Sequence, residues 1–296
     1  MKFFAVVALF PVLATAIPLD GRADSTQIDD TTVLNYALTL EHLENAFYSG
    51  ALARFTQDDF VKAGLPTWAR SRFSEIAAHE KAHVDFLSKA LGSNATQACE
   101  YNFPYTDPKS FAALSQVLEN VGVSAYAGAA QFIQDKSYLT AAAVVLSTEA
   151  RHAGWVESAV NKHAGWSGAL DVPLGLNEVF SLAAPFIKSC PSSNPTLPVK
   201  AFPKLTIANA APGSAAKVTH DATDSDGELN VAFFTGLSQL IVPLKDGMVT
   251  IPDSLKGTVY AVLTTVKEAG QAAEGNIKAG PAVLYYPTDS QGMVRV

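Results

Sequence analysis

Glutamate recurs between residues 41 and 149 in an alternating pattern that strongly limits the possible fold. A Glu-x6-Tyr pair is followed by a Glu-x-x-His pair, and the series then repeats; the residues are Glu41 and Tyr48, Glu80 and His83, Glu119 and Tyr126, and Glu149 and His152. In an α-helix, residues three or seven positions apart project from nearly the same face. A bundle of four helices would therefore bring four carboxylates and two imidazoles together in its interior.

The surrounding sequence has the periodicity and the end signals of helices. Apolar residues recur at helical spacing from about residue 29 to residue 189. We predict four long segments and a short fifth, at 29–54, 66–91, 107–134, 137–163 and 177–189. Pro66 is favoured at a helix start and Gly92 at a helix end. These signals predict an antiparallel four-helix bundle with a short extra helix over residues 29–190.

The pattern changes after the last of these segments. Residues 191–200 are rich in proline, so no helix can continue there, and we place a linker and a domain boundary in this stretch. Over residues 201–296, short β-branched and aromatic runs alternate with Gly, Pro, Asp and Asn, at 204–208, 229–234, 240–244, 258–266 and 282–286. We predict a small all-β sandwich of immunoglobulin-like type. The fold class is therefore mainly α, followed by an all-β domain.

The N-terminal residues predict export. Residues 1–16 combine a charged start, a short apolar run and the small residues Ala14-Thr15-Ala16, as a signal peptide does. A membrane anchor is the competing interpretation, but the apolar run is shorter than a bilayer crossing requires. We therefore expect a secreted, extracellular protein without a membrane span.

Export makes a disulfide and an N-linked glycan possible. Cys99 and Cys190, the only cysteines, are candidates for one disulfide, with two free buried thiols as the alternative. Asn94 opens an Asn-x-Thr sequence that could accept an N-glycan, although many such sequences are not used.

The net charge of −7 and the lack of a Lys/Arg-rich stripe argue against nucleic acid and anionic membranes as partners. An extracellular or cell-wall partner stays open, as does the oligomeric state.

The alternating pattern matches the ligand set of a dinuclear carboxylate centre. Such a centre takes one Glu from each of two helices and Glu-x-x-His from each of the other two. We assign Glu80 and Glu149 as bridging carboxylates. The terminal ligands would be Glu41, Glu119, His83 and His152. Carboxylate and imidazole ligands suit two iron or manganese ions, and they do not distinguish between these metals.

Other polar residues near the pattern have ordinary alternatives. Tyr48 and Tyr126 could hydrogen-bond the ligand carboxylates or take part in one-electron steps, and plain packing with a satisfied hydroxyl is the alternative for both. Charged and imidazole side chains on helices are usually solvated. Four neighbours of the ligands in the sequence could form an entry path or an outer shell around them, but we favour surface positions for each; they are His42, Glu44, Glu75 and His79.

The series of Glu-x6-Tyr and Glu-x-x-His pairs resembles that of the ferritin/rubrerythrin superfamily. The stretch from Leu40 to Tyr48 is similar to the ferritin-like domain of secreted fungal stress-response and late-sexual-development proteins and of plant desiccation-related proteins. The likeness covers about residues 30–165, and it implies a di-iron-type fold and a link to stress or development without a defined reaction. Related di-iron proteins often have an acidic residue before Glu-x-x-His, where this chain has His79 and Thr148.

Three functions are compatible with these features. The first is a di-metal oxidoreductase, a ferroxidase or a peroxidase/catalase-like enzyme, whose small-molecule oxidant is dioxygen or peroxide. The second is a secreted metal-binding or structural protein without turnover, and the third is a metal-free ferritin-like scaffold that serves interaction. A closed iron-storage cage is disfavoured because an appended β domain and a glycan would obstruct its dense shell. Metal content and an oxidation assay separate these functions.

Overall fold

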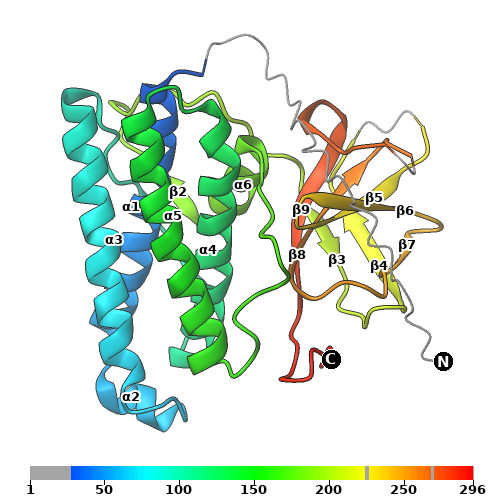
Figure 1. Cartoon of the computed structure of the whole chain (residues 1–296), viewed down its shortest axis with the longest axis horizontal. Coiled ribbons are helices and arrows are strands. Elements are labelled where there is room, and N and C mark those ends of the chain that lie inside the picture. Colours follow the sequence, from blue (N-terminus) through cyan, green and yellow to red (C-terminus); the bar gives the residue numbers. More distant parts are fainter. Residues whose placement is uncertain (1–27, 224–226, 268–269, 296) are drawn as a thin grey trace, which may run out of the picture.

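The computed structural model describes residues 28–223, 227–267 and 270–295. The predicted signal peptide, residues 1–16, lies outside these residues. Helices fill the first part of the described chain and β-sheets the second, as Figure 1 shows. This order confirms the predicted succession of a helical region and a β region. Among the described residues, no helix combines the length and the apolar character that a membrane crossing requires.

The helical part is built from four long helices, which lie side by side in Figure 1. They are α1 (Asp30–Arg54), α3 (Ala69–Leu91), α4 (Pro108–Ala129) and α5 (Lys136–Trp155). Helix α1 packs mainly on α3, and α4 packs mainly on α5. Side-chain caps fix the N-termini of three of them: Asp29 accepts a hydrogen bond from Thr32 N, Asp107 from Ser110 N and Asp135 from Ser137 N.

Shorter elements complete the helical part and differ from the prediction. Helix α2 (Gln57–Lys62), which the periodicity did not indicate, lies between α1 and α3. Helix α5 is continued by a π-helical turn at Val156–Val160, and α6 covers Leu176–Ala183. The predicted fifth helix is therefore too long at its C-terminal end. Pro185 explains the difference, because proline lacks the N–H that would continue the helix.

A disulfide and a short sheet hold the end of the helical part in place. Cys99 and Cys190 are joined in a disulfide that spans 91 residues of sequence. Beside it, β1 (Glu100–Tyr101) pairs in an antiparallel manner with β2 (Ile187–Ser189). The loop after α3 is thereby tied to the segment after α6. The predicted linker begins directly after this cross-link.

The β part contains two antiparallel sheets. The first has the order β3-β4-β7, with β3 (Leu205–Ile207), β4 (Ala215–His220) and β7 (Met248–Thr250). The second has the order β6-β5-β8-β9, with β5 (Asn230–Thr235), β6 (Ser238–Pro243), β8 (Gly257–Thr264) and β9 (Ile277–Tyr286). Side chains of both sheets, among them Val218 and Phe233, share one hydrophobic cluster. The sequence did not predict β4, which begins with two alanines, or β7, which has only three residues.

The helical and β parts share a continuous apolar core. One hydrophobic cluster combines Val121 and Val179 of the helices with Phe234 and Val262 of the four-stranded sheet. At this junction α4 also approaches the backbone of Leu174 closely, since a Cβ added to Gly128 would lie 1.8 Å from the Leu174 carbonyl oxygen. Glycine at this position therefore permits the contact. The exact domain boundaries, at residues 190 and 200, stay a prediction.

Candidate metal centre

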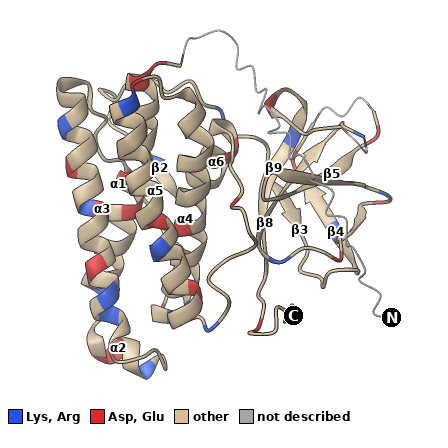
Figure 2. Cartoon of the chain, viewed as in Figure 1, with Lys and Arg blue, Asp and Glu red and all other residues tan. Residues whose placement is uncertain are grey.

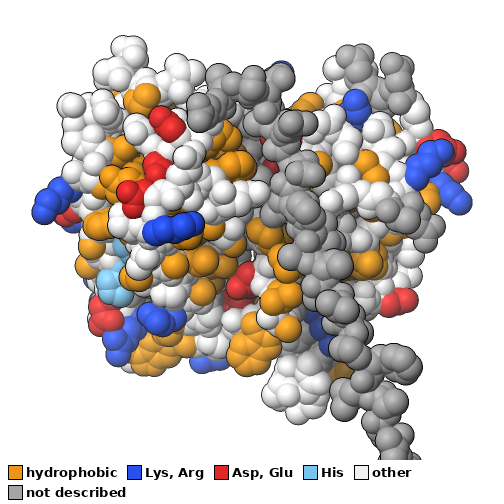
Figure 3. Space-filling view, turned by 45° about the horizontal axis from the view of Figure 1, so that its top comes forward, with side chains coloured by type: hydrophobic (Ala, Val, Ile, Leu, Met, Phe, Trp, Pro, Cys, Tyr) orange, Lys and Arg blue, Asp and Glu red, His pale blue; other side chains and the backbone are white. Residues whose placement is uncertain are grey.

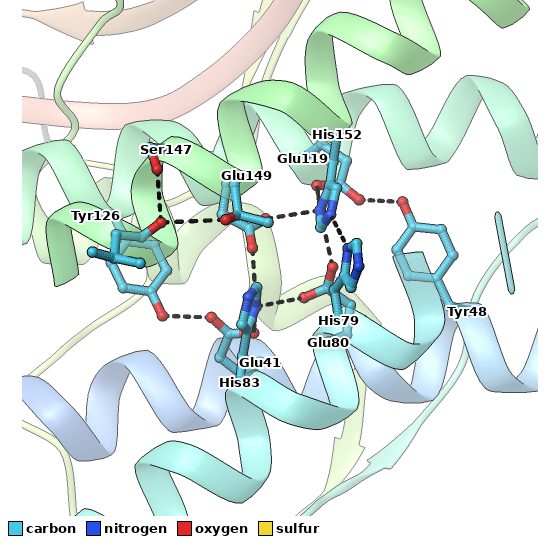
Figure 4. A network of polar contacts seen from close by, with 12 residues as sticks. Glu41, Tyr48, His79, Glu80, His83, Glu119, Tyr126, Ser147, Glu149 and His152 are labelled. Atoms are coloured by element: carbon cyan, nitrogen blue, oxygen red, sulfur yellow. Dashed lines mark hydrogen bonds and ion pairs between the residues drawn. The ribbon is translucent and has the colours of Figure 1, made fainter. Parts of the chain in front are cut away.

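The six predicted ligands project into the space between the four long helices, as Figure 4 shows. Helix α1 supplies Glu41, α3 supplies Glu80 and His83, α4 supplies Glu119, and α5 supplies Glu149 and His152. All four glutamates are 0% exposed, His152 is buried and the side chain of His83 is 12% exposed. Figure 2 shows that Lys, Arg, Asp and Glu are interspersed along α3. The four glutamates of the centre are buried, and in this they differ from the charged residues on the surface of α3.

These residues form two overlapping groups of possible metal ligands. One group is Glu41, Glu80, His83 and Glu149, and the other is Glu80, Glu119, Glu149 and His152. Within each group, the ligand atoms lie within 4.8 Å of one another. Only Glu80 and Glu149 belong to both groups. Each group thus has one histidine and one glutamate of its own, together with the two shared carboxylates.

Each histidine directs its Nδ1 atom toward carboxylates. His83 Nδ1 lies 3.2 Å from one oxygen each of Glu41, Glu80 and Glu149. His152 Nδ1 lies 3.1 Å from Glu80 Oε1 and 3.3 Å from Glu119 Oε2. Both nitrogen atoms therefore face the same interior space, from opposite ends of the shared carboxylates.

Several of these atoms lack hydrogen-bond partners among the described residues. They are Glu80 Oε1, Glu119 Oε2, both carboxylate oxygens of Glu149 and His152 Nδ1. A buried polar atom without a partner typically costs about 1–3 kcal/mol, and more when it is charged. Divalent cations would satisfy all of them, because carboxylate oxygens and imidazole nitrogens are good ligands for iron and manganese. The donor set therefore fits a pair of metal ions.

The pKa values also indicate a cluster that needs positive charge. Burial raises the pKa of Glu149 to about 8, and the nearby carboxylate of Glu119 adds to this effect. Burial alone would lower the pKa of both histidines, but their contacts with carboxylates outweigh it and raise the pKa to about 12 for His83 and about 10 for His152. Without a metal, protons on the histidines supply part of the neutralising charge.

Two tyrosines hold the outer glutamates. Tyr48 of α1 donates a hydrogen bond to Glu119 Oε1 of α4, and Tyr126 of α4 donates one to Glu41 Oε1 of α1. Burial raises the pKa of both tyrosines well above the usual value, so their hydroxyls stay protonated donors. The hydrogen bonds position two carboxylates from opposite sides of the bundle, and the tyrosines therefore do more than pack.

His79 orients one of the candidate ligands. Its Nδ1 atom lies 2.9 Å from His152 Nε2, and the two rings are stacked with their centroids 5.2 Å apart. Burial and the neighbouring His152 lower the pKa of His79, so a neutral ring can accept the hydrogen bond from His152. The surface position favoured for His79 is right, since the side chain is exposed, and its contact with His152 also agrees with the alternative of an outer shell around the ligands. Figure 3 shows histidine atoms at the surface of the helical part.

The surface position favoured for Glu44 is wrong. It is only 5% exposed, and burial followed by the charge of Glu149 raises its pKa well above the usual value. Gly122 makes room for it, because a Cβ at that position would lie 3.1 Å from Glu44 Oε1 and 3.3 Å from Glu149 Oε2. The spacing Glu41-x-x-Glu44 on one helix face was the sequence signal for this placement.

The remaining neighbours behave more ordinarily. Glu75 is exposed and forms an ion pair with Arg72 one turn before it, as expected for the surface. His42 is half-buried, and its Nε2 atom lies 3.1 Å from the Thr96 carbonyl oxygen. Thr148 donates its hydroxyl to Val144 O on the same helix, so it contributes nothing comparable to His79.

Comparison with known proteins finds similarity over the region that contains this centre. Residues 29–162 match the family model described as the ferritin-like domain, a range that contains all six candidate ligands. A relative, protein rds1 of the fission yeast Schizosaccharomyces pombe, is 27% identical over 194 residues. The alignment covers 60% of this chain and 44% of that protein. The chain thus spans less than half of the length of the curated relative that it matches.

Proposed function

We propose that the ferritin-like domain formed by residues 29–162 holds two divalent metal ions, iron or manganese, and uses them to oxidise ferrous iron or to consume peroxide. The observation that carries this proposal is the pair of ligand groups that share Glu80 and Glu149. Shared carboxylates are the usual bridges of a dinuclear centre. The four glutamates would also balance the charge of two divalent ions.

The ligand roles follow from this sharing. Glu80 and Glu149 would bridge the two ions. Glu41 and His83 would complete one site, and Glu119 and His152 the other. When bound, iron or manganese would supply the electron transfer and Lewis acidity that protein side chains lack.

The surrounding residues would support this chemistry by fixing the ligands and excluding water. Tyr48 and Tyr126 each engage one oxygen of an outer glutamate and leave the other oxygen for a metal. Around Tyr48, the rings of Phe47, Phe73 and Phe111 lie 5.1, 6.2 and 5.8 Å away from centroid to centroid. This aromatic cluster keeps one end of the centre dry, and a dry site strengthens the electrostatic interactions inside it.

The wider setting is part of the proposal. We infer a secreted protein that acts during stress or sexual development, with a small-molecule oxidant or a metal ion as its partner. The disulfide is compatible with export. Asn94 lies exposed in a short 3-10 turn, so its side chain is accessible for the attachment of a glycan. The immunoglobulin-like type of the β part and an extracellular partner belong to the same proposal.

A ferrous oxidation assay tests the activity. Protein loaded anaerobically with ferrous iron is expected to form ferric iron faster than iron in buffer when dioxygen or hydrogen peroxide is added, measured by absorbance in a stopped-flow instrument. The E80A/E149A variant is expected to react at the buffer rate. The E75A variant, which changes an exposed glutamate on the same helix, serves as the matched control. Retained metal without faster oxidation would favour the metal-binding protein without turnover.

Replacement of His79 is expected to weaken one metal site and spare the other. A partner that orients a ligating histidine typically contributes about 10–100-fold in metal affinity. His79→Ala should therefore lower affinity by this factor at the Glu119/His152 site only, because His79 contacts His152. Titration against a metal-binding dye measures both affinities. Equal weakening of both sites, or no change at either, would contradict the orienting role.

A further inference from the structure

Another buried carboxylate without a full set of partners lies outside the candidate metal centre, at the junction of the two parts of the chain. Glu178 belongs to α6, which Figure 1 places between the long helices and the β-sheets. The residue is 6% exposed, and its Oε2 atom has no hydrogen-bond partner among the described residues. The carboxylate lies against Gly175, where an added Cβ would be only 2.2 Å from Oε2. Glycine at position 175 thus leaves space for the charge.

Glu178 lines a cavity of about 110 Å³. Its walls come from both parts of the chain, with Phe132 and Val172 on the helical side and Phe234 and Leu237 on the sheet side. An apolar cavity of about 150 Å³ is large enough to admit benzene. The present cavity is smaller, but its lining includes the exposed Leu237, so it opens to solvent and does not have to enclose a ligand completely. It therefore suits a small molecule whose apolar body is only partly enclosed.

The charged side chains in the described lining of this cavity are both negative. Glu274 is the other carboxylate of its lining, and no Lys, Arg or His side chain is among the described lining residues. Two neighbouring amides already have partners, since Gln239 bonds both backbone groups of Ala272 and Asn177 Oδ1 accepts from Lys200 N. Burial, reinforced by Glu274, raises the pKa of Glu178 to about 7. A buried carboxylate without a partner is costly, so the missing element is a cation or a strong donor.

We propose that this cavity binds a small organic cation, an amine with an apolar body, whose ammonium group donates a hydrogen bond to the carboxylate of Glu178. The apolar body would lie between Phe132 and Phe234, and Glu274 would add attraction at longer range. A neutral molecule of the same shape lacks the charge, and an anion would be repelled by both glutamates. The site is independent of the proposed metal centre, because none of the six candidate ligands lines the cavity.

Three probes of similar shape test the charge preference. Phenethylamine, 2-phenylethanol and phenylacetate are titrated into the full secreted protein, and binding is followed by isothermal calorimetry with and without added metal. Phenethylamine is expected to bind about tenfold or more tightly than 2-phenylethanol, because a hydrogen bond to a charged group is stronger than a neutral one. Phenylacetate is expected to bind more weakly still. Equal binding of all three probes, or no binding of phenethylamine at millimolar concentration, would overturn the proposal and leave water as the partner of Glu178.

Two variants locate the site. Glu178→Gln keeps the size of the side chain and removes its charge, so phenethylamine binding should fall about tenfold. Leu237→Lys places a cation at an exposed position of the lining and should weaken binding without disturbing the buried core. Met248→Lys makes the same change at an exposed residue of β7, outside the lining, and should bind like the parent. Unchanged binding in both the E178Q and L237K variants would show that the amine binds elsewhere.

Discussion

The E80A/E149A variant is expected to retain no metal, whereas the parent protein, secreted by a suitable host, carries about two iron or manganese ions per chain. Both glutamates belong to both ligand groups, so their loss removes two ligands from each site. Elemental analysis after extensive buffer exchange measures the content. If the variant retained metal, other residues would have to bind the ions. If the parent contained no metal, the function would be that of a metal-free ferritin-like scaffold.

The stability of the same variant gives an independent check. Glu80 and Glu149 are fully buried, and some of their oxygens have no hydrogen-bond partner in the part of the chain that the structure describes, so their removal should relieve a desolvation cost in metal-free protein. We expect the metal-free variant to be at least as stable as the metal-free parent, despite the lost side-chain volume. Metal should stabilise only the parent, by about 2.7 kcal/mol at a concentration 100 times the Kd. Thermal melting with and without metal measures both effects.

Single variants sharpen the assignment of the two sites. Glu41 belongs to one ligand group only, and Glu119 belongs to the other only. Glu41→Ala and Glu119→Ala should therefore each weaken one site more than the other, whereas E75A should match the parent. A parent-like metal content in E80A/E149A together with a loss of metal in E75A would contradict the assignment of the ligands.

Removal of the disulfide is expected to produce the second large effect. The double substitution Cys99→Ser and Cys190→Ser should lower the free energy of unfolding by about 4–5 kcal/mol, because the cross-link closes a loop of 91 residues and restricts the unfolded chain. The β1–β2 pairing beside it should become easier to open. Urea unfolding followed by circular dichroism of the helices measures the change.

Metal content separates this effect from damage to the centre. The cysteines belong to neither ligand group, so the C99S/C190S variant should keep the metal content of the parent under native conditions. Reduction of the parent protein should reproduce the loss of stability. A decrease below about 1 kcal/mol in both experiments would mean that β1–β2 pairing and packing hold this region without help from the cross-link.

Much of the candidate centre was predictable because its signal is local. Residues three or seven positions apart share a helix face, and this rule alone aligns Glu41 with Tyr48 and Glu80 with His83. The helix starts predicted at residues 29 and 107 depend on similarly local chemistry, since the side chains of Asp29 and Asp107 cap backbone groups only a few residues away. The short strands β4 and β7 were not predicted, because their local patterns are weak and their pairing joins distant segments.

The sequence by itself determined that the chain has a helical part with inward-facing Glu and His residues, followed by a β part. Only the tertiary structure decided which further groups meet them. Glu44 is buried because Gly122, on another helix, leaves space beside Glu149. His79 contacts His152 across two helices, and Glu178 reaches a cavity whose walls come from both parts of the chain. Such contacts depend on how distant segments pack. Spacing along one helix can indicate the face on which Glu44 lies, but it does not identify the residues of other helices that meet it.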